Sequence, residues 1–108
     1  MDSFPETFGL KQCMEIIETQ QDVLVKEIRQ NFYDKVMEAA KKCKKDVELT
    51  FPENLWDEHR LKITRELVQK FGEIRVISIQ DKAKSKRPIS DPNDVPKNVD
   101  AITIQFSK

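Results

Sequence analysis

The chain has 108 residues, of which 38% are apolar and 35% are charged, and its 19 basic and 19 acidic residues cancel to a net charge of zero. A chain of this length corresponds to a single domain, 1–108, and leaves no room for both a large substrate cleft and the shell that would support it. A net charge of zero also argues against a dedicated nucleic-acid coat protein, which is usually basic overall.

The cysteines and the lengths of the apolar segments indicate the cellular compartment in which the protein is expected. Cys13 and Cys43 are the only cysteines and lie 30 positions apart, which is roughly 45 Å along a straight helix. If both lie on one such helix, they cannot pair within the chain, and free thiols are typical of a reducing compartment. The segment 1–10 lacks the features of a secretory signal, and no apolar run approaches the roughly 20 residues of a membrane span. We therefore expect an intracellular, cytoplasmic protein with no membrane partner.

A long amphipathic helix is predicted over residues 10–45, which contain neither proline nor glycine. Its apolar residues recur with gaps of three, four and seven, the spacing of one helical face. They are Leu10, Met14, Ile17, Leu24, Ile28, Phe32, Val36, Ala39 and Cys43. Such a helix would be roughly 54 Å long, whereas a compact domain of this size is only about 25–30 Å across. Either the helix breaks near Thr19–Asp22, or another chain covers part of its apolar face.

The residues after the helix predict a β-α-β-β head. The expected elements are a strand over 46–51, a helix over 55–71 that begins after Asn54 and ends at Gly72, a strand over 74–80 and a strand over 101–106. Residues 81–99 hold three prolines and many charges, which predicts a mobile loop. The fold class is therefore α+β, in the order α-β-α-β-β, with a three-stranded sheet packed on helices. We expect a crossover between the first two strands and antiparallel pairing of the last two.

The layout between residues 36 and 106 is similar to that of a known group of proteins. A helix ends in Ala39–Lys42 and is followed by the alternating strand 46–51, and in the second helix Leu67 precedes Gly72 by five residues. Two short strands complete the chain. This layout resembles small uncharacterised proteins of tailed phages and large DNA viruses. The resemblance implies a viral accessory or virion-associated role, and it carries no catalytic motif and no functional residues.

The sequence contains no pattern that predicts an enzyme. Its one histidine, His59, lies among charged residues at the start of the second helix and is expected to be a solvated first-turn residue. One histidine and two distant cysteines cannot form a structural zinc site. The only glycines are Gly9 and Gly72, so a phosphate-binding loop is excluded. We expect no catalytic residues, no cofactor, no metal and no small-molecule substrate.

The charges of the predicted helix divide it into two halves. Through residue 22 there are five acidic residues and one basic residue, a charge of −4. Residues 23–45 hold seven basic and three acidic residues, a charge of +4. The helix macrodipole explains basic residues in the last turn but not those in the middle. Two such helices complement each other when they are antiparallel, as in a two-fold, coiled-coil homodimer.

Two basic clusters raise nucleic-acid binding as an alternative. They comprise Lys41, Lys42, Lys44 and Lys45, and Lys82, Lys84, Lys86 and Arg87. Phosphate contacts of this kind are sensitive to salt, and the absence of interleaved aromatic residues leaves base stacking unsupported. The ordinary interpretation is a solvated helix end and a charged loop, which we prefer. The stretch 82–88 also resembles a short basic targeting signal, which would indicate the nucleus.

The sequence therefore predicts a non-enzymatic structural or interaction protein that self-associates through its long helix, with a dimer favoured. The interface is expected to be centred on Ile17, Leu24, Ile28 and Phe32. The Leu24→Asp substitution is expected to break the dimer while leaving the head folded.

Overall fold

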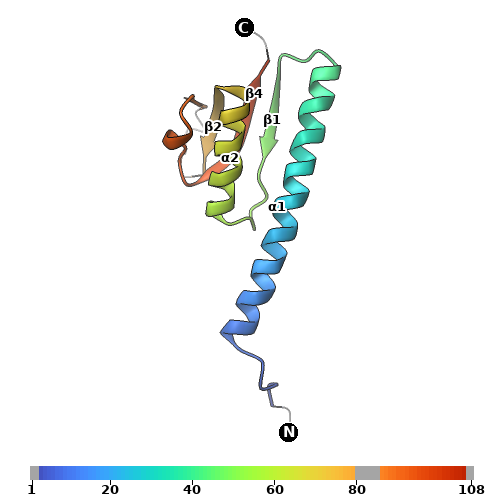
Figure 1. Cartoon of the computed structure of the whole chain (residues 1–108), viewed down its shortest axis with the longest axis vertical. Coiled ribbons are helices and arrows are strands. Elements are labelled where there is room, and N and C mark those ends of the chain that lie inside the picture. Colours follow the sequence, from blue (N-terminus) through green and yellow to red (C-terminus); the bar gives the residue numbers. More distant parts are fainter. Residues whose placement is uncertain (1–2, 80–85, 107–108) are drawn as a thin grey trace.

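The first helix is unbroken in the computed structural model, which describes residues 3–79 and 86–106. Helix α1 (Leu10–Lys41) has 32 residues and continues through Thr19–Asp22, where a break had been considered. The molecule measures 67 × 29 × 23 Å. Helix α1 accounts for most of this length, roughly 48 Å, because its first turns extend beyond the head, as Figure 1 shows. The expected long helix is confirmed, although it ends four residues earlier than predicted.

The chain reverses direction at the end of α1 through a turn in which Cys43 adopts a backbone conformation typical of glycine. This residue has a φ of 55°, the left-handed conformation that usually favours glycine. Its N–H donates to the carbonyl of Ala40 at 3.1 Å, and the N–H of Lys44 donates to Ala39 at 2.9 Å. These two bonds form a Schellman motif, which satisfies the last carbonyls of the helix. The turn leads directly into the first strand.

The sheet has four antiparallel strands, one more than the sequence predicted. They are β1 (Asp46–Thr50), β2 (Ile74–Ser78), β3 (Arg87–Ile89) and β4 (Val99–Gln105). Their order is β1-β4-β2-β3. Strands β1 and β2 each pair antiparallel with β4, so they are parallel to each other, and helix α2 (Asp57–Phe71) connects them. The crossover is therefore present, but β4 lies between its two strands.

The described part of the predicted mobile loop is ordered structure. Residues 86–99 contain β3, which pairs with β2, and a short 3-10 helix, η1 (Pro92–Asp94). Pro88 is tolerated because β3 is an edge strand, where a missing N–H costs little. Ile89 and Val95 are buried and attach the segment to the core. The remaining positions, 80–85, lie outside the described residues.

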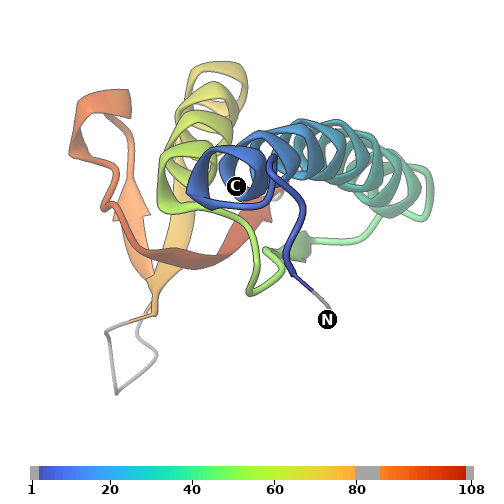
Figure 2. The same ribbon diagram turned by 90° about the horizontal axis from the view of Figure 1, so that it is seen from below.

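Both helices cover the same face of the sheet, as Figure 2 shows. The core between them contains Ile28, Phe32, Leu49, Phe51, Leu55, Ile63, Val68, Ile74, Val76, Ile89, Val95, Val99, Ile102 and Ile104. Burying an aliphatic or aromatic side chain of this size contributes about 1.5–3 kcal/mol. Only the second half of α1 contributes to this core.

Two buried polar residues hold the connection between β1 and α2. Gln21 donates from Nε2 to the carbonyl of Asn54 at 2.8 Å and accepts from the N–H of Trp56 at 3.0 Å. Arg60 is only 2% exposed. Its guanidinium donates to the carbonyls of Leu55, Val99, Pro52 and Glu53 at 3.0, 2.8, 2.6 and 3.3 Å. Helix α2 accordingly begins after Trp56 rather than after Asn54, because the backbone of this loop is bonded to Gln21 and Arg60.

Candidate functional site

The first exposed feature of the molecule is its N-terminal end, residues 3–20, which we call the arm. Every residue of the arm is exposed except Gly9, which is half-buried. Large apolar side chains nevertheless occur along it: Phe4, Phe8, Leu10, Met14, Ile16 and Ile17. Phe4 and Phe8 stack on each other with ring centroids 4.6 Å apart. The arm is thus an apolar surface that the head does not cover, and Figure 1 shows it projecting from the head.

The head covers only part of the predicted interface. Ile28 and Phe32 are buried in the core of the protomer, and Leu24 is partly buried against it. Ile17 alone is exposed, at 38%. The prediction that all four residues form one surface for a second copy is therefore corrected, because the sheet and α2 already cover the helix from Gln21 onward. Leu24→Asp would disturb the core as well as any interface.

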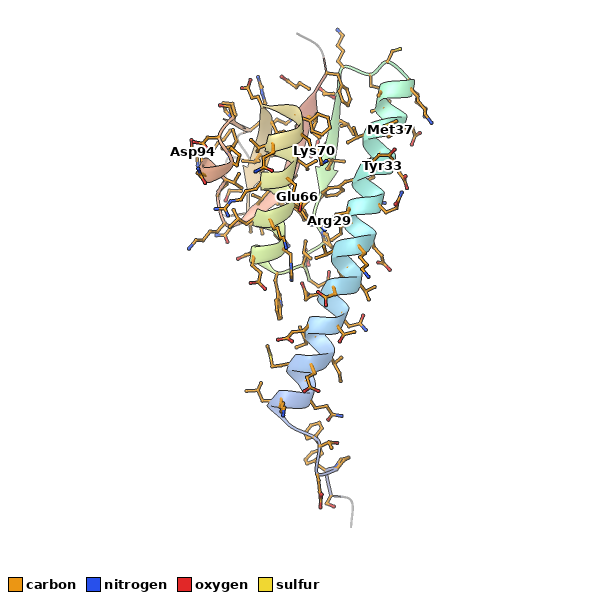
Figure 3. The ribbon with its side chains drawn as sticks, in the orientation of Figure 1. Arg29, Tyr33, Met37, Glu66, Lys70 and Asp94 are labelled. Carbon is orange, nitrogen blue, oxygen red and sulfur yellow. The ribbon has the colours of Figure 1, made fainter. Side chains whose placement is uncertain are left out.

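The second exposed feature is an apolar groove between α1 and α2, with a volume of about 500 Å³. Most of its wall is apolar, and a few charged side chains lie at its rim. The lining residues are Arg29, Phe32, Tyr33, Val36, Met37, Ala40, Ile63, Glu66, Leu67, Lys70, Phe71 and Phe106. In Figure 3, Tyr33 and Met37 on α1 lie across from Lys70 on α2. Both helices rest on the sheet, but this groove remains open between them.

One ion pair bridges the groove. Arg29 Nη2 donates to Glu66 Oε1 at 2.6 Å, and both side chains are about two-fifths exposed. Figure 3 shows this pair spanning the space between the two helices. Partly exposed pairs of this kind contribute little to stability, about 0–1 kcal/mol. From this pair towards the end of α1, most of the groove wall is apolar. Tyr33 is part of this wall and is 61% exposed.

The sequence did not reveal this groove. Tyr33 and Met37 are four positions apart, but they lie beside the main apolar stripe of α1 rather than on it. That off-stripe pair was the one available signal, because apolar residues outside the core-facing stripe of a helix need a second surface to contact. Phe71 and Phe106 come from distant parts of the chain, so only the tertiary structure brings them to the groove.

The basic clusters do not form one surface in the part of the chain that is described. Lys41, Lys42, Lys44 and Lys45 precede the edge strand β1, whereas Lys86 and Arg87 lie at the opposite edge, on and before β3. The two edges are three strand spacings apart, roughly 14 Å. Lys82 and Lys84 lie outside the described residues.

Lys42 is also engaged by a carboxylate. Its Nζ donates to Glu38 Oε1 at 2.7 Å. This hydrogen bond and the charge of Lys42 hold the pKa of Glu38 below its ordinary value. One member of the first basic cluster is therefore partly neutralised by its own helix.

His59 is half-buried rather than fully solvated, and its ring stacks on Trp56 with centroids 6.1 Å apart. Its nearest carboxylate oxygen, in Glu58, lies 3.8 Å away. Cys13 and Cys43 are free and exposed. Within residues 3–79 and 86–106, no group of three or more histidine, cysteine or acidic side chains is placed to hold a metal ion. No helix of this described part is long and apolar enough to cross a membrane.

The chain matches no protein-family model, no curated protein sequence and no solved structure in the comparisons with known proteins. The arm and the groove therefore stand as the candidate sites on their physical properties alone.

Proposed function

We propose that this chain is a non-enzymatic interaction protein that self-associates through its N-terminal arm. The observation that carries this proposal is the row of exposed apolar side chains on the arm. Ile16 is 55% exposed and Phe4 is 78% exposed. Contiguous exposed apolar surfaces of this kind mark the sites at which proteins interact.

The arm has no means of covering itself with its own head. Helix α1 is continuous from Leu10 to Lys41, so the arm continues in the direction of the helix and leads away from the sheet. Bending it back would require breaking the helix. A second chain is therefore the simplest cover for Leu10, Met14 and Ile17.

The charges of the chain favour a second copy as that cover. Through residue 22 the net charge is −4, and over residues 23–45 it is +4. Antiparallel helices bring each acidic half beside a basic half, which steers association and fixes the orientation. This arrangement has two-fold symmetry, the commonest symmetry of soluble oligomers. An accessory or virion-associated role, which the resemblance to phage and large-virus proteins implies, is one setting for such a dimer.

The test is the mass of the protein in solution, measured by size exclusion coupled to light scattering. At tens of micromolar we expect a dimer, about twice the 12.7 kDa of one chain. Ile17→Asp places a charge on the apolar face of the arm and should weaken the dimer at least tenfold, since burying an unpaired charge is costly. The head should remain folded, because Ile17 does not contribute to its core.

The matched control is Gln12→Asp, which adds the same charge to the exposed arm on the side of the helix away from Leu10, Met14 and Ile17. We expect this variant to dimerise nearly as well as the parent. A monomer of 12.7 kDa for the parent at tens of micromolar would overturn the proposal.

A further inference from the structure

We infer that the groove between α1 and α2 receives the arm of a second copy, so that two copies exchange arms. This inference rests on the proposed self-association and specifies the surface that the arm contacts. It joins the two exposed apolar features of the molecule. Each of them lacks a cover among the described residues of its own chain.

The chemistry of the two surfaces matches. The groove is walled by apolar side chains, among them Tyr33, Met37 and Phe71, which are all exposed. The helical part of the arm is amphipathic and presents Leu10, Met14 and Ile17 along one face. An amphipathic helix laid in an apolar groove, with anchors at spacings of three, four and seven, is a common mode of protein recognition.

The lengths of the two surfaces also match. Along α1 the groove extends from Arg29 to Ala40, which is roughly 16 Å of helix. The helical part of the arm, Leu10 to Gln20, is roughly 15 Å long. One arm is therefore long enough to occupy one groove. The Arg29–Glu66 pair would lie at the end of the groove where the arm joins the rest of its own helix.

A single two-fold axis satisfies both contacts. If the two α1 helices are antiparallel with the axis near Val25, the arm residues 10–20 of each copy face the groove residues 30–40 of the other. Because the same operation makes both contacts, the assembly closes as a dimer rather than extending into a filament.

The charges favour this occupant over a neutral or basic helix. The arm and the residues just after it carry Glu6, Glu15, Glu18 and Asp22 against Lys11 alone. On the groove, Arg29 already pairs with Glu66, whereas Lys70 forms no ion pair with any described residue. Lys70 lies on the α2 wall, as Figure 3 shows, so an acidic arm in the groove would be close to it. The last turn of α1, which contains Lys41, adds further positive charge at the end of the groove next to Ala40.

Disulfide mapping tests this contact with the native Cys13 of the arm as the probe. In a Cys43→Ser background, Met37→Cys adds a thiol to the groove wall at the position that faces residue 13 under the proposed symmetry. We expect mild oxidation to convert the full-length protein largely to a covalent dimer that dithiothreitol reverses. The control is Asp94→Cys, which places an exposed thiol on η1, away from the groove.

Two further variants identify which thiols react. Cys43→Ser alone reports cross-linking between two copies of Cys13, and Cys13→Ser with Met37→Cys reports cross-linking between two groove thiols. The proposal requires the Cys13 and Met37→Cys combination to exceed both, and the Asp94→Cys control, by at least fivefold. A dimer in light scattering with no such excess would overturn the groove contact and leave self-association standing. A monomer in light scattering would overturn both.

A charge placed in the groove provides the independent measurement. Ala40→Glu adds a carboxylate to an exposed residue of the groove wall, which faces the apolar Leu10 of the arm under the proposed symmetry, and burying a charge against an apolar side chain is costly. We expect it to raise the dimer dissociation constant at least tenfold. Gln69→Glu adds the same charge to an exposed position of α2 outside the groove and should leave the constant within threefold. Equal effects of the two substitutions would contradict docking in the groove.

Discussion

Single residues explain how such a small head is held together. Arg60 is buried without any carboxylate partner among the described residues, and four backbone carbonyls accept from its guanidinium instead. Its guanidinium also lies 5.8 Å from the ring centroid of Phe51. Buried polar groups are tolerated when their hydrogen bonds are made. Arg60 therefore joins the loop after β1 to strand β4.

Cys43 is the residue at which a substitution is expected to stabilise the protein. It has a φ of 55°, a conformation that costs an L-residue roughly 1–2 kcal/mol. Glycine avoids that cost but loses about 0.4–1 kcal/mol through the entropy of the unfolded chain. Cys43→Gly should therefore raise the free energy of unfolding by roughly 0.5–1 kcal/mol. Urea denaturation followed by circular dichroism measures this change.

The same position provides the control for Cys43→Gly. Cys43→Val places a β-branched residue in the left-handed region, where it is strained, and should lower the free energy of unfolding. If both substitutions had the same sign, the backbone conformation of this residue would not be the determining factor.

At the scale of elements, helix α1 lies in two environments although its apolar stripe is continuous. Its first third, residues 10–20, belongs to the exposed arm, and its later part places Ile28, Phe32 and Ala39 against the sheet and α2. Gln21 lies at the boundary. It occupies a stripe position, and it is buried because it bonds to the backbone that begins α2.

Replacing Gln21 is expected to loosen the attachment of α1 to the start of α2. Gln21→Leu keeps a similar size but leaves the carbonyl of Asn54 and the N–H of Trp56 without their partner. A buried group left unpaired costs about 1–3 kcal/mol. The midpoint of urea denaturation should fall accordingly. Gln20→Leu makes the same chemical change at an exposed neighbour and should change the midpoint little; a similar fall for both would show that these hydrogen bonds do not matter.

At the scale of the whole molecule, the arm and the head are expected to be separable. The arm supplies no side chain to the core, and Gly9 is its one half-buried residue. Deleting residues 1–18 should therefore leave a folded head that is monomeric at tens of micromolar. The thermal midpoint, measured at low micromolar concentration, should change by only a few degrees. An unfolded product, or a truncated chain that still dimerises, would contradict this division.

The sequence alone determined the elements that local patterns specify. The 3.6-residue periodicity of α1, the alternation in β1 and β4 and the glycine at the end of α2 were sufficient for the α+β class and for most boundaries. Strand β3 was missed, because three residues containing Pro88 carry almost no alternating pattern. Its pairing with the edge of β2 is a long-range contact that local patterns do not report.

The sequence also determined that an apolar stripe longer than one head runs along the first helix, together with the opposite charges of its two halves. Only the tertiary structure decided which part of the stripe the head covers, and it assigned Ile28 and Phe32 to the core and Ile17 to the surface. Only the tertiary structure placed Phe71 and Phe106 beside Tyr33 to form the groove. The physical reason is that periodicity reports which side chains avoid water, whereas the identity of the surface that covers them depends on residues far apart in the chain.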